Sequence, residues 1–347
     1  MVDFYPVITD DGTLSLFNTK INDIYHSKIG ACTEAFYKFT LPSGVLEYAR
    51  NNDNIRILDV CYGLGYNSRV TISEILKVNP SCKINVTGIE IDPDVLAYSY
   101  FVTFNNENCL SKSAFRHILL TNTQLRRLIT DFNKSVNFNS KIKHHLKPFY
   151  QKFHKCHQSF YVKPADNRLL HNIYYGTISH RNKYNCKITY SNKNLEIDLY
   201  INDLRKQIIN LNEPYDFIFH DPFTPSLVPS LWSVELFEEL YRLLKHEGTL
   251  TTYTSSAAVR SGMIEAGFFV GRTTPVGRKS SGTIAYKNNK LIRTPPDKVE
   301  KGLLETNAGI PYYDPGFKFT DEQIIINREE LLKKSGRMST SQYLKSV

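Results

Sequence analysis

The 347-residue chain contains no run of 18 apolar residues, so none of its segments is long and apolar enough to span a membrane. Its first residues, MVDFYPVITDDG, carry acidic side chains early and lack the basic-then-apolar order of a secretory signal. The six cysteines show no CxxC spacing, which argues against disulfide or zinc frameworks. We therefore expect a cytoplasmic protein with reduced thiols and no membrane partner.

Phosphate-binding glycine loops are also missing, because the sequence has neither GxGxxG nor GK[ST] after a predicted strand. Instead, an apolar strand over residues 55–60 runs into Cys61-Tyr62-Gly63-Leu64-Gly65-Tyr66-Asn67 and a helical stretch. A strand, a glycine turn and a helix let backbone approach a nucleotide-like ligand. The spacing of Asp59, Gly63 and Gly65 resembles the LDVxxGxG loop of S-adenosylmethionine enzymes, in which Asp59 would face the methionine end of the ligand.

Acidic residues are scarce in one segment. Residues 105–195 contain 16 Lys and Arg against 3 Asp and Glu, a charge of +13, whereas the rest of the chain carries −4 of the net +9. Interleaved aromatic residues give this segment the composition of a nucleic-acid-binding surface, although a solvated basic subdomain would look the same. The candidate RNA-binding residues are Arg126, Arg127, Lys141, Lys143 and Lys147.

The same segment holds seven of the ten histidines. Four of them lie close to Cys156 in the sequence, but their spacing fits no usual zinc ligand set and a basic neighbourhood disfavours a cation. The sequence therefore predicts no metal site.

Carboxylates follow three further predicted strands, at residues 84–89, 195–201 and 216–220. Ligands of open α/β sheets bind at the carboxyl ends of the strands, where Glu90 is expected to accept both ribose hydroxyls. Asp203 is expected at the adenine amino edge. A surface acidic residue before a helix is the alternative interpretation, and it fits Asp92 better than Glu90.

The third of these strand ends reads Asp221-Pro222-Phe223-Thr224-Pro225. Prolines fix φ and remove donors, so carbonyls and the Asp221 carboxylate can face a ligand as acceptors beside the Phe223 ring. Acceptors beside an aromatic face suit an amine on a flat ring, and the string is similar to the Asp-Pro-Pro-aromatic turn of amino-methyltransferases. Asp-Pro is also a common turn without function.

The order of strands and helices predicts an α/β fold, a Rossmann-like class I methyltransferase with a seven-stranded sheet. The catalytic domain would comprise residues 51–104 and 195–290, with a basic insertion at 105–194 as the candidate nucleic-acid-binding part. Residues 1–50 form an N-terminal extension with an antiparallel turn at 10–12 and a helix capped by Thr33. The tail, 291–347, is expected to hold one helix, over 321–335.

Several segments in order resemble the methyltransferase domain of MnmC, the bifunctional tRNA 5-methylaminomethyl-2-thiouridine biosynthesis family. The most specific are YDFIFHDPFTPSLVPSLWSVELFEEL and GTLTTYTSSAAVRSGMIEAGFFVGRTTPVGRK. The resemblance implies methyl transfer from S-adenosyl-L-methionine to the aminomethyl nitrogen of a wobble uridine in tRNA. It implies catalytic roles for Asp221 and Phe223. Its implied cofactor-binding positions include Glu34, Gly63, Gly65, Asn67, Glu90 and Asp203.

Two departures from the family pattern matter. Cys61 stands where the family loop has a glycine, and no second dinucleotide loop is present for an FAD-dependent oxidase domain. We therefore expect methylation of an aminomethyl group without removal of a carboxymethyl group. Two other functions stay open: a small-molecule amine methyltransferase or polyamine-synthase-like aminopropyltransferase, and a non-catalytic RNA-binding protein on the same fold.

Overall fold

The computed structural model describes residues 4–11, 13–27, 29–92, 95, 186–191, 194–277 and 280–347. Most of the predicted basic insertion therefore lies outside the described residues, as do its five candidate RNA-binding side chains and the clustered histidines. No helix in the described ranges is long and apolar enough to cross a membrane.

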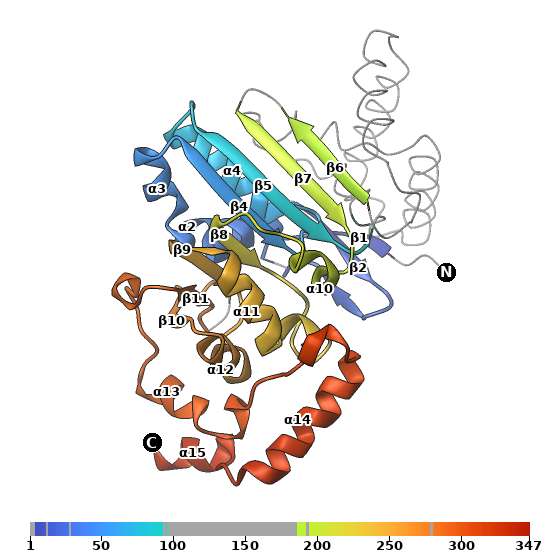
Figure 1. Ribbon diagram of the computed structural model, residues 1–347, viewed down its shortest axis with the longest axis vertical. Coiled ribbons are helices and arrows are strands. Elements are labelled where there is room, and N and C mark those ends of the chain that lie inside the picture. The colour runs from blue at the N-terminus through green and yellow to red at the C-terminus, as the bar shows by residue number, and fades with distance from the viewer. Residues whose placement is uncertain are drawn as a thin grey trace.

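A mixed sheet of eight strands forms the centre of the molecule (Figure 1). Its spatial order is β10-β11-β9-β8-β4-β5-β7-β6. The central strands β9, β8, β4, β5 and β7 are parallel, whereas β11, β10 and β6 join antiparallel. The strands are β4 (Asn54–Val60), β5 (Lys83–Glu90), β6 (Cys186–Ser191), β7 (Leu195–Ile201), β8 (Tyr215–His220), β9 (Leu244–Thr252), β10 (Phe269–Arg272) and β11 (Thr283–Tyr286).

Seven of these strands give the predicted Rossmann-like pattern with its late antiparallel hairpin, so the fold class is confirmed. The eighth, β6, extends the sheet beyond β7 and comes from the end of the segment predicted to be an insertion. The strict polar–apolar alternation of β7 fits this position near the sheet edge. Its apolar residues are buried, whereas the residues between them face the side of the sheet that is less covered there.

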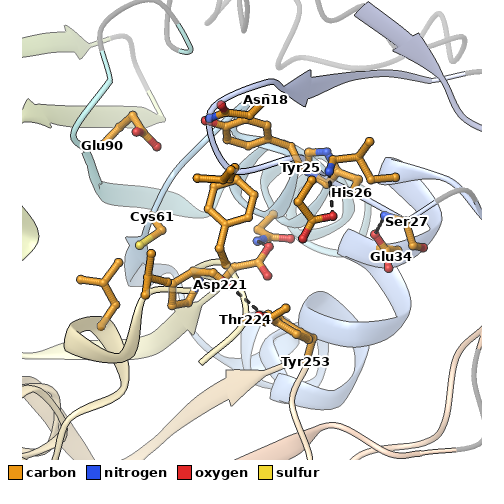
Figure 2. Close-up of a pocket in the computed structure, with 18 of the residues that line it drawn as sticks. Asn18, Tyr25, His26, Ser27, Glu34, Cys61, Glu90, Asp221, Thr224 and Tyr253 are labelled. Carbon is orange, nitrogen blue, oxygen red and sulfur yellow. Dashed lines mark hydrogen bonds between the residues drawn. The ribbon is translucent and has the colours of Figure 1, made fainter. Parts of the chain in front are cut away.

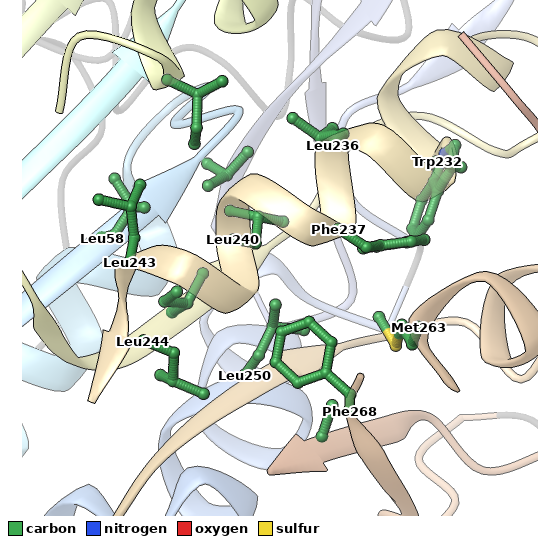
Figure 3. Packing of buried hydrophobic residues seen from close by; sticks show 14 of the residues in the cluster. Leu58, Trp232, Leu236, Phe237, Leu240, Leu243, Leu244, Leu250, Met263 and Phe268 are labelled. Atoms are coloured by element: carbon green, nitrogen blue, oxygen red, sulfur yellow. The ribbon is translucent and has the colours of Figure 1, made fainter. Parts of the chain in front are cut away.

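Helices cover both faces of the sheet, which explains why β4 and β8 read as nearly continuous apolar runs. On one face, Leu58 and Val60 pack with side chains of α10 (Leu204–Ile208), α11 (Val234–Leu243) and α12 (Ala257–Glu265). Figure 3 shows Leu58 in this cluster with residues of α11 and with Met263 of α12. On the other, Ile55 and Ile57 pack with α3 (Val45–Asn51), α4 (Tyr66–Val78) and η1 (Ala35–Thr40). Each fully buried aliphatic side chain contributes about 1.5–3 kcal/mol to these layers.

The N-terminal extension forms a separate three-stranded antiparallel sheet of β1 (Phe4–Ile8), β2 (Leu14–Asn18) and β3 (Asp23–Ile24). Its first turn lies where the sequence predicts it. The following helix begins at Ala31 rather than after Thr33, because the Thr33 hydroxyl and amide both donate to Asp11. This short α1 (Ala31–Glu34) continues into the π-helical turn η1 and then α2 (Leu41–Ser43).

The C-terminal tail contains more helix than predicted. Helix α14 (Asp321–Ser335) has the expected bounds, with a Thr320–Gln323 capping box and Gly336 as its C-cap. The expectation of a single helix is wrong, because α13 (Lys298–Leu304) and α15 (Thr340–Ser346) each begin with a capping box of their own. Short 3-10 turns complete the chain: η2 (Pro229–Trp232), η3 (Asn289–Leu291), η4 (Asn307–Gly309) and η5 (Pro315–Phe317).

Candidate functional site

A cavity of about 710 Å³ lies at the carboxyl ends of β4, β5, β7 and β8 and is covered by the segment from Asn18 to Phe39 (Figure 2). Its volume is in the range of small-molecule and cofactor sites, and its place is the one expected for an open α/β sheet. Six of the predicted site residues line it: Glu34, Asn67, Glu90, Asp203, Asp221 and Phe223.

The loop between β4 and α4 depends on its two predicted glycines. Gly63 and Gly65 have φ values of 54° and 76°, in the left-handed region that favours glycine. A Cβ on Gly65 would lie 2.5 Å from the Tyr62 ring, so this position admits no side chain without rearrangement. The glycines shape the loop and do not line the cavity themselves.

Cys61, which also lines the cavity, has a φ of 60° without being glycine. This backbone conformation is costly for a residue with a Cβ. Burial, with Glu90 and Asp221 nearby, raises the pKa of the Cys61 thiol well above its usual value. The side chain is therefore a neutral thiol in the cavity wall and not a thiolate nucleophile.

Glu90 ends β5 with its carboxylate held by two backbone amides. The Gly63 amide donates to Oε2 at 2.8 Å, and the Asp92 amide donates to Oε1 at 2.9 Å. Burial raises the pKa of Glu90 to about 7, although these hydrogen bonds oppose the shift. Each oxygen keeps a second lone pair, so a fixed bidentate acceptor faces the cavity, as a vicinal diol requires.

Asp59 does not line the cavity, in contrast to the expectation that it faces the ligand. Its side chain is fully buried, and Oδ2 accepts hydrogen bonds from the Ser68 amide and hydroxyl in the first turn of α4. Burial raises the pKa of Asp59 to about 7. The residue thus anchors the helix behind the glycine loop.

Asp203 lines the cavity at the end of β7 and also caps α10 by accepting from the Arg205 amide at 3.0 Å. The Arg205 guanidinium lies 3.5 Å from Asp203 and 2.9 Å from the buried Asp314 of the tail. The tail thereby fixes one side of the cavity through Arg205, a connection that the sequence did not predict.

Asp221 follows β8 and faces the cavity between Glu90 and Glu34 (Figure 2). Asn67 donates from Nδ2 to its Oδ2 at 2.9 Å, so the predicted cofactor residue Asn67 orients this carboxylate. Burial raises the pKa of Asp221 well above its usual value, with Glu34 and Asp59 adding to the shift. A carboxylate of raised basicity that points into a cavity suits proton acceptance.

The turn that follows Asp221, at Pro222 and Phe223, is held in place by two hydrogen bonds. Trp232 donates from its indole to the Phe223 carbonyl at 2.8 Å, and Tyr253 donates from its hydroxyl to the Pro222 carbonyl at 3.0 Å. Tyr25 of the N-terminal extension meets the Phe223 ring edge-on, with 5.0 Å between ring centroids. The Phe223 ring is therefore held in the lining of the cavity that Asp221 also faces.

The N-terminal side of the cavity contains an ion pair. Glu34 accepts from the Ser27 amide at 2.7 Å through Oε2 and pairs with Lys38 through Oε1. Burial alone would raise the pKa of Glu34, but Lys38 and Ser27 hold it below its usual value. The sequence predicted Glu34 but missed Lys38, Tyr25 and His26 in the lining, because no motif marks them.

These residues fit a nucleoside-containing amino acid cofactor. Glu90 offers a bidentate acceptor for a diol, and Glu34 offers a carboxylate for a cationic group. Within the described ranges, His, Cys, Asp and Glu side chains form no group of three or more that could hold a metal ion.

The sequence and the fold are both similar to those of known proteins. Residues 167–288 match the family model described as S-adenosyl-L-methionine-dependent methyltransferase. The chain is 27% identical to an uncharacterized protein of Methanocaldococcus jannaschii over 330 residues, which cover 94% of this chain and 72% of that protein. It is 36% identical over 94 residues to the tRNA 5-methylaminomethyl-2-thiouridine biosynthesis bifunctional protein MnmC of Pseudomonas putida, covering 27% of this chain and only 14% of that protein.

Among solved structures, MnmC2 from Aquifex aeolicus is similar with a TM-score of 0.65 and 24% sequence identity. The match covers 96% of this chain and 86% of that chain, and it establishes a shared fold.

Proposed function

This chain carries an S-adenosylmethionine-dependent methyltransferase domain of the MnmC type, and on that premise we propose that it methylates the aminomethyl nitrogen of 5-aminomethyluridine, or its 2-thio form, at the tRNA wobble position. The observation that carries the proposal is the Asp221 carboxylate, oriented by Asn67, beside Phe223 and in one cavity with Glu90. The name of the Pseudomonas relative supports tRNA as the substrate class.

In this proposal, Glu90 accepts hydrogen bonds from the ribose hydroxyls and Asp203 lies at the adenine edge of S-adenosylmethionine. The Gly63 amide holds the Glu90 carboxylate in place, and Asp59 supports the glycine loop from behind. When bound, the cofactor supplies an electrophilic methyl group on a sulfonium. The protein then has to place a neutral amine in line with it, and such positioning is worth roughly 7–11 kcal/mol.

The substrate amine has to lose a proton, because an alkylamine with a pKa near that of lysine, about 10, is mostly protonated at neutral pH. Asp221 accepts that proton, and its raised pKa makes it a stronger base than an exposed aspartate. With its proton removed, an amine held at Asp221 would be able to accept the methyl group that the cofactor would supply. Phe223 offers its face to the flat uracil ring.

The direct test is incubation of the purified chain with labelled S-adenosylmethionine and tRNA that carries 5-aminomethyluridine, followed by mass spectrometry of the nucleosides. We expect one added methyl group on the modified wobble nucleoside. Matched tRNA with an unmodified uridine is the control. Methylation or aminopropylation of polyamines instead of tRNA would favour the small-molecule alternative, and cofactor binding without transfer to any amine would contradict the proposal.

The basic segment is proposed to bind the tRNA backbone. If its Lys and Arg residues contact about five phosphates, log K should fall with log salt at a slope near −4.5. Neutralising Arg126, Arg127, Lys141, Lys143 and Lys147 should remove most of that slope. The control neutralises five exposed lysines of the tail, Lys298, Lys301, Lys318, Lys333 and Lys334, which changes the net charge equally. A variant of the basic segment that keeps the full slope would assign tRNA binding to another surface.

A further inference from the structure

The ion pair between Glu34 and Lys38 differs from the other helix pairs in how little water reaches it. Its side chains are 10% and 13% exposed and line the cavity, whereas Glu74 and Lys77 of α4 are 25% and 50% exposed. Removing two charges from water is costly unless each finds partners. Ion pairs contribute little net stability even at the surface, where the cost of desolvation is small. Stability therefore does not explain why this pair is buried.

The position of the pair along the cavity suggests that explanation. Figure 2 shows Glu90 at one end, Asp221 in the middle and Glu34 at the opposite end. A ribose held at Glu90 and a reacting centre near Asp221 place the remaining part of the cofactor at Glu34 and Lys38. That part of S-adenosylmethionine is an α-amino acid, with one ammonium and one carboxylate.

We infer that Glu34 and Lys38 form a zwitterion site, in which Glu34 binds the ammonium and Lys38 binds the carboxylate of the cofactor's amino acid end. This inference rests on the cofactor assignment of the proposed function and adds a specificity-determining residue, Lys38. Each side chain exchanges or shares its present partner for a ligand group of the same charge, so no charge in the cavity is left unpaired. The Ser27 amide keeps Glu34 oriented during the exchange.

The local backbone presents both side chains to the cavity. Glu34 ends α1, and Lys38 lies within η1, a π-helical turn. Such turns are rare and occur frequently at functional sites. Phe39 on the same turn lines the cavity as well and packs edge-on against Phe219 of β8, which ties the turn to the sheet.

A consequence is discrimination between carboxylated and decarboxylated cofactors. A ligand with an aminopropyl group in place of the amino acid brings a second ammonium without a carboxylate. Glu34 then has to pair with both the ligand ammonium and Lys38, and an incompletely paired buried charge is costly. Lys38 therefore favours methyl transfer over aminopropyl transfer, because the latter reaction uses the decarboxylated cofactor.

Calorimetric titration with three ligands tests the inference without measuring catalysis. S-adenosylhomocysteine carries the whole amino acid, its decarboxylated aminopropyl analogue lacks the carboxylate, and methylthioadenosine lacks both charged groups. The wild-type chain should bind S-adenosylhomocysteine about 10- to 100-fold more tightly than the aminopropyl analogue, the usual size of a charge-assisted hydrogen bond. Lys38→Met should abolish this preference by weakening S-adenosylhomocysteine alone. Glu34→Gln should weaken both ammonium-bearing ligands and leave methylthioadenosine unaffected.

Lys77→Met is the matched control, because it breaks an exposed Lys–Glu helix pair away from the cavity and should change none of the three affinities. Methylthioadenosine binding shows that each variant is folded at the nucleoside end. Equal weakening of all three ligands by Lys38→Met, or no weakening at all, overturns the inference while the proposed function stands. A wild-type chain that binds none of the three overturns the proposed function and the inference with it.

Discussion

The two walls of the cavity are built in different ways. The sheet wall presents Glu90, Asp203 and Asp221, each at the end of a parallel strand whose neighbours fix its place. The N-terminal wall presents Tyr25 from just after β3, Glu34 from α1 and Lys38 from the π-helical turn, none of which belongs to the central sheet. Strand order therefore determines the first wall, whereas distant contacts determine the second.

The largest expected effect lies in the sheet wall at Asp221. Asp221→Asn keeps the size and one acceptor but removes the base, so methyl transfer should fall by about 10²- to 10⁴-fold at pH 7. The loss should shrink at alkaline pH, where more of the substrate amine is already neutral. Single-turnover methylation of aminomethyluridine tRNA across pH measures both effects.

Cofactor binding provides the control for that experiment, since affinity for S-adenosylhomocysteine should stay near the wild-type value. If Asp221 only shaped the turn before Pro222, asparagine would serve almost as well. A fall of less than about fivefold at pH 7 would therefore assign Asp221 a structural role.

The next effect concerns the nucleoside end of the same wall. Glu90→Ala removes the bidentate acceptor and should weaken S-adenosylhomocysteine binding by at least about 10- to 100-fold, as expected for lost hydrogen bonds to a charged group. Glu196→Ala, at an exposed position of the neighbouring strand β7, is the matched control. Calorimetry that finds unchanged affinity in Glu90→Ala would remove Glu90 from the cofactor site.

The contrast between the walls also explains what the sequence could predict. The apolar runs of β4 and β8, and the carboxylates that follow the strands, are local signals, so the fold and the sheet wall were predictable. Lys38 carries no motif, and its role depends on a cavity formed by residues far apart in the chain. Thr33 has the residue type of a helix cap, but its hydroxyl bonds Asp11, 22 positions earlier. Helices α13 and α15 are too short to show a period, although their capping boxes are visible in the sequence.

Asp59 belongs to strand β4 but lies behind the glycine loop and does not line the cavity. Its substitution therefore tests whether a strand-end carboxylate can be structural and not ligand-binding. Asp59→Asn and Ser68→Ala each remove part of the anchor of α4, and each should lower the free energy of unfolding by about 1–3 kcal/mol. Methylthioadenosine affinity should change little in either variant. Denaturant unfolding measures the free energy of unfolding, and calorimetry measures the affinity. A binding defect without destabilisation would show that Asp59 contacts the ligand.

The buried carboxyls of Asp59 and Glu90 also set a pH dependence. Both have folded-state pKa values of about 7, above the ordinary values of 3.8 and 4.5, so the folded state holds more protons between those limits. Stability should therefore fall as pH rises from about 4 to 7. The asparagine of Asp59→Asn cannot titrate. The free energy of unfolding of this variant, measured with denaturant across that pH range, should therefore decline less steeply than that of the wild type. An equally steep decline in the variant would mean that the Asp59 carboxyl does not titrate there.

The smallest expected effect is at Cys61, where the loop departs from the glycine of the family pattern. At a φ of 60°, a Cβ costs about 1–2 kcal/mol, and glycine removes this cost. Its greater freedom in the unfolded state offsets roughly 0.5–1 kcal/mol of that gain. Cys61→Gly should therefore raise the free energy of unfolding by about 0.5–1 kcal/mol. Gly336→Ala is the reverse control, because the α14 C-cap has a φ of 62° with nothing near its Cβ position, and it should lose a similar amount. Since the neutral thiol offers the ligand no charge, S-adenosylhomocysteine affinity should not fall in Cys61→Gly. Weaker binding in the stabilised variant would show that the thiol itself contacts the cofactor.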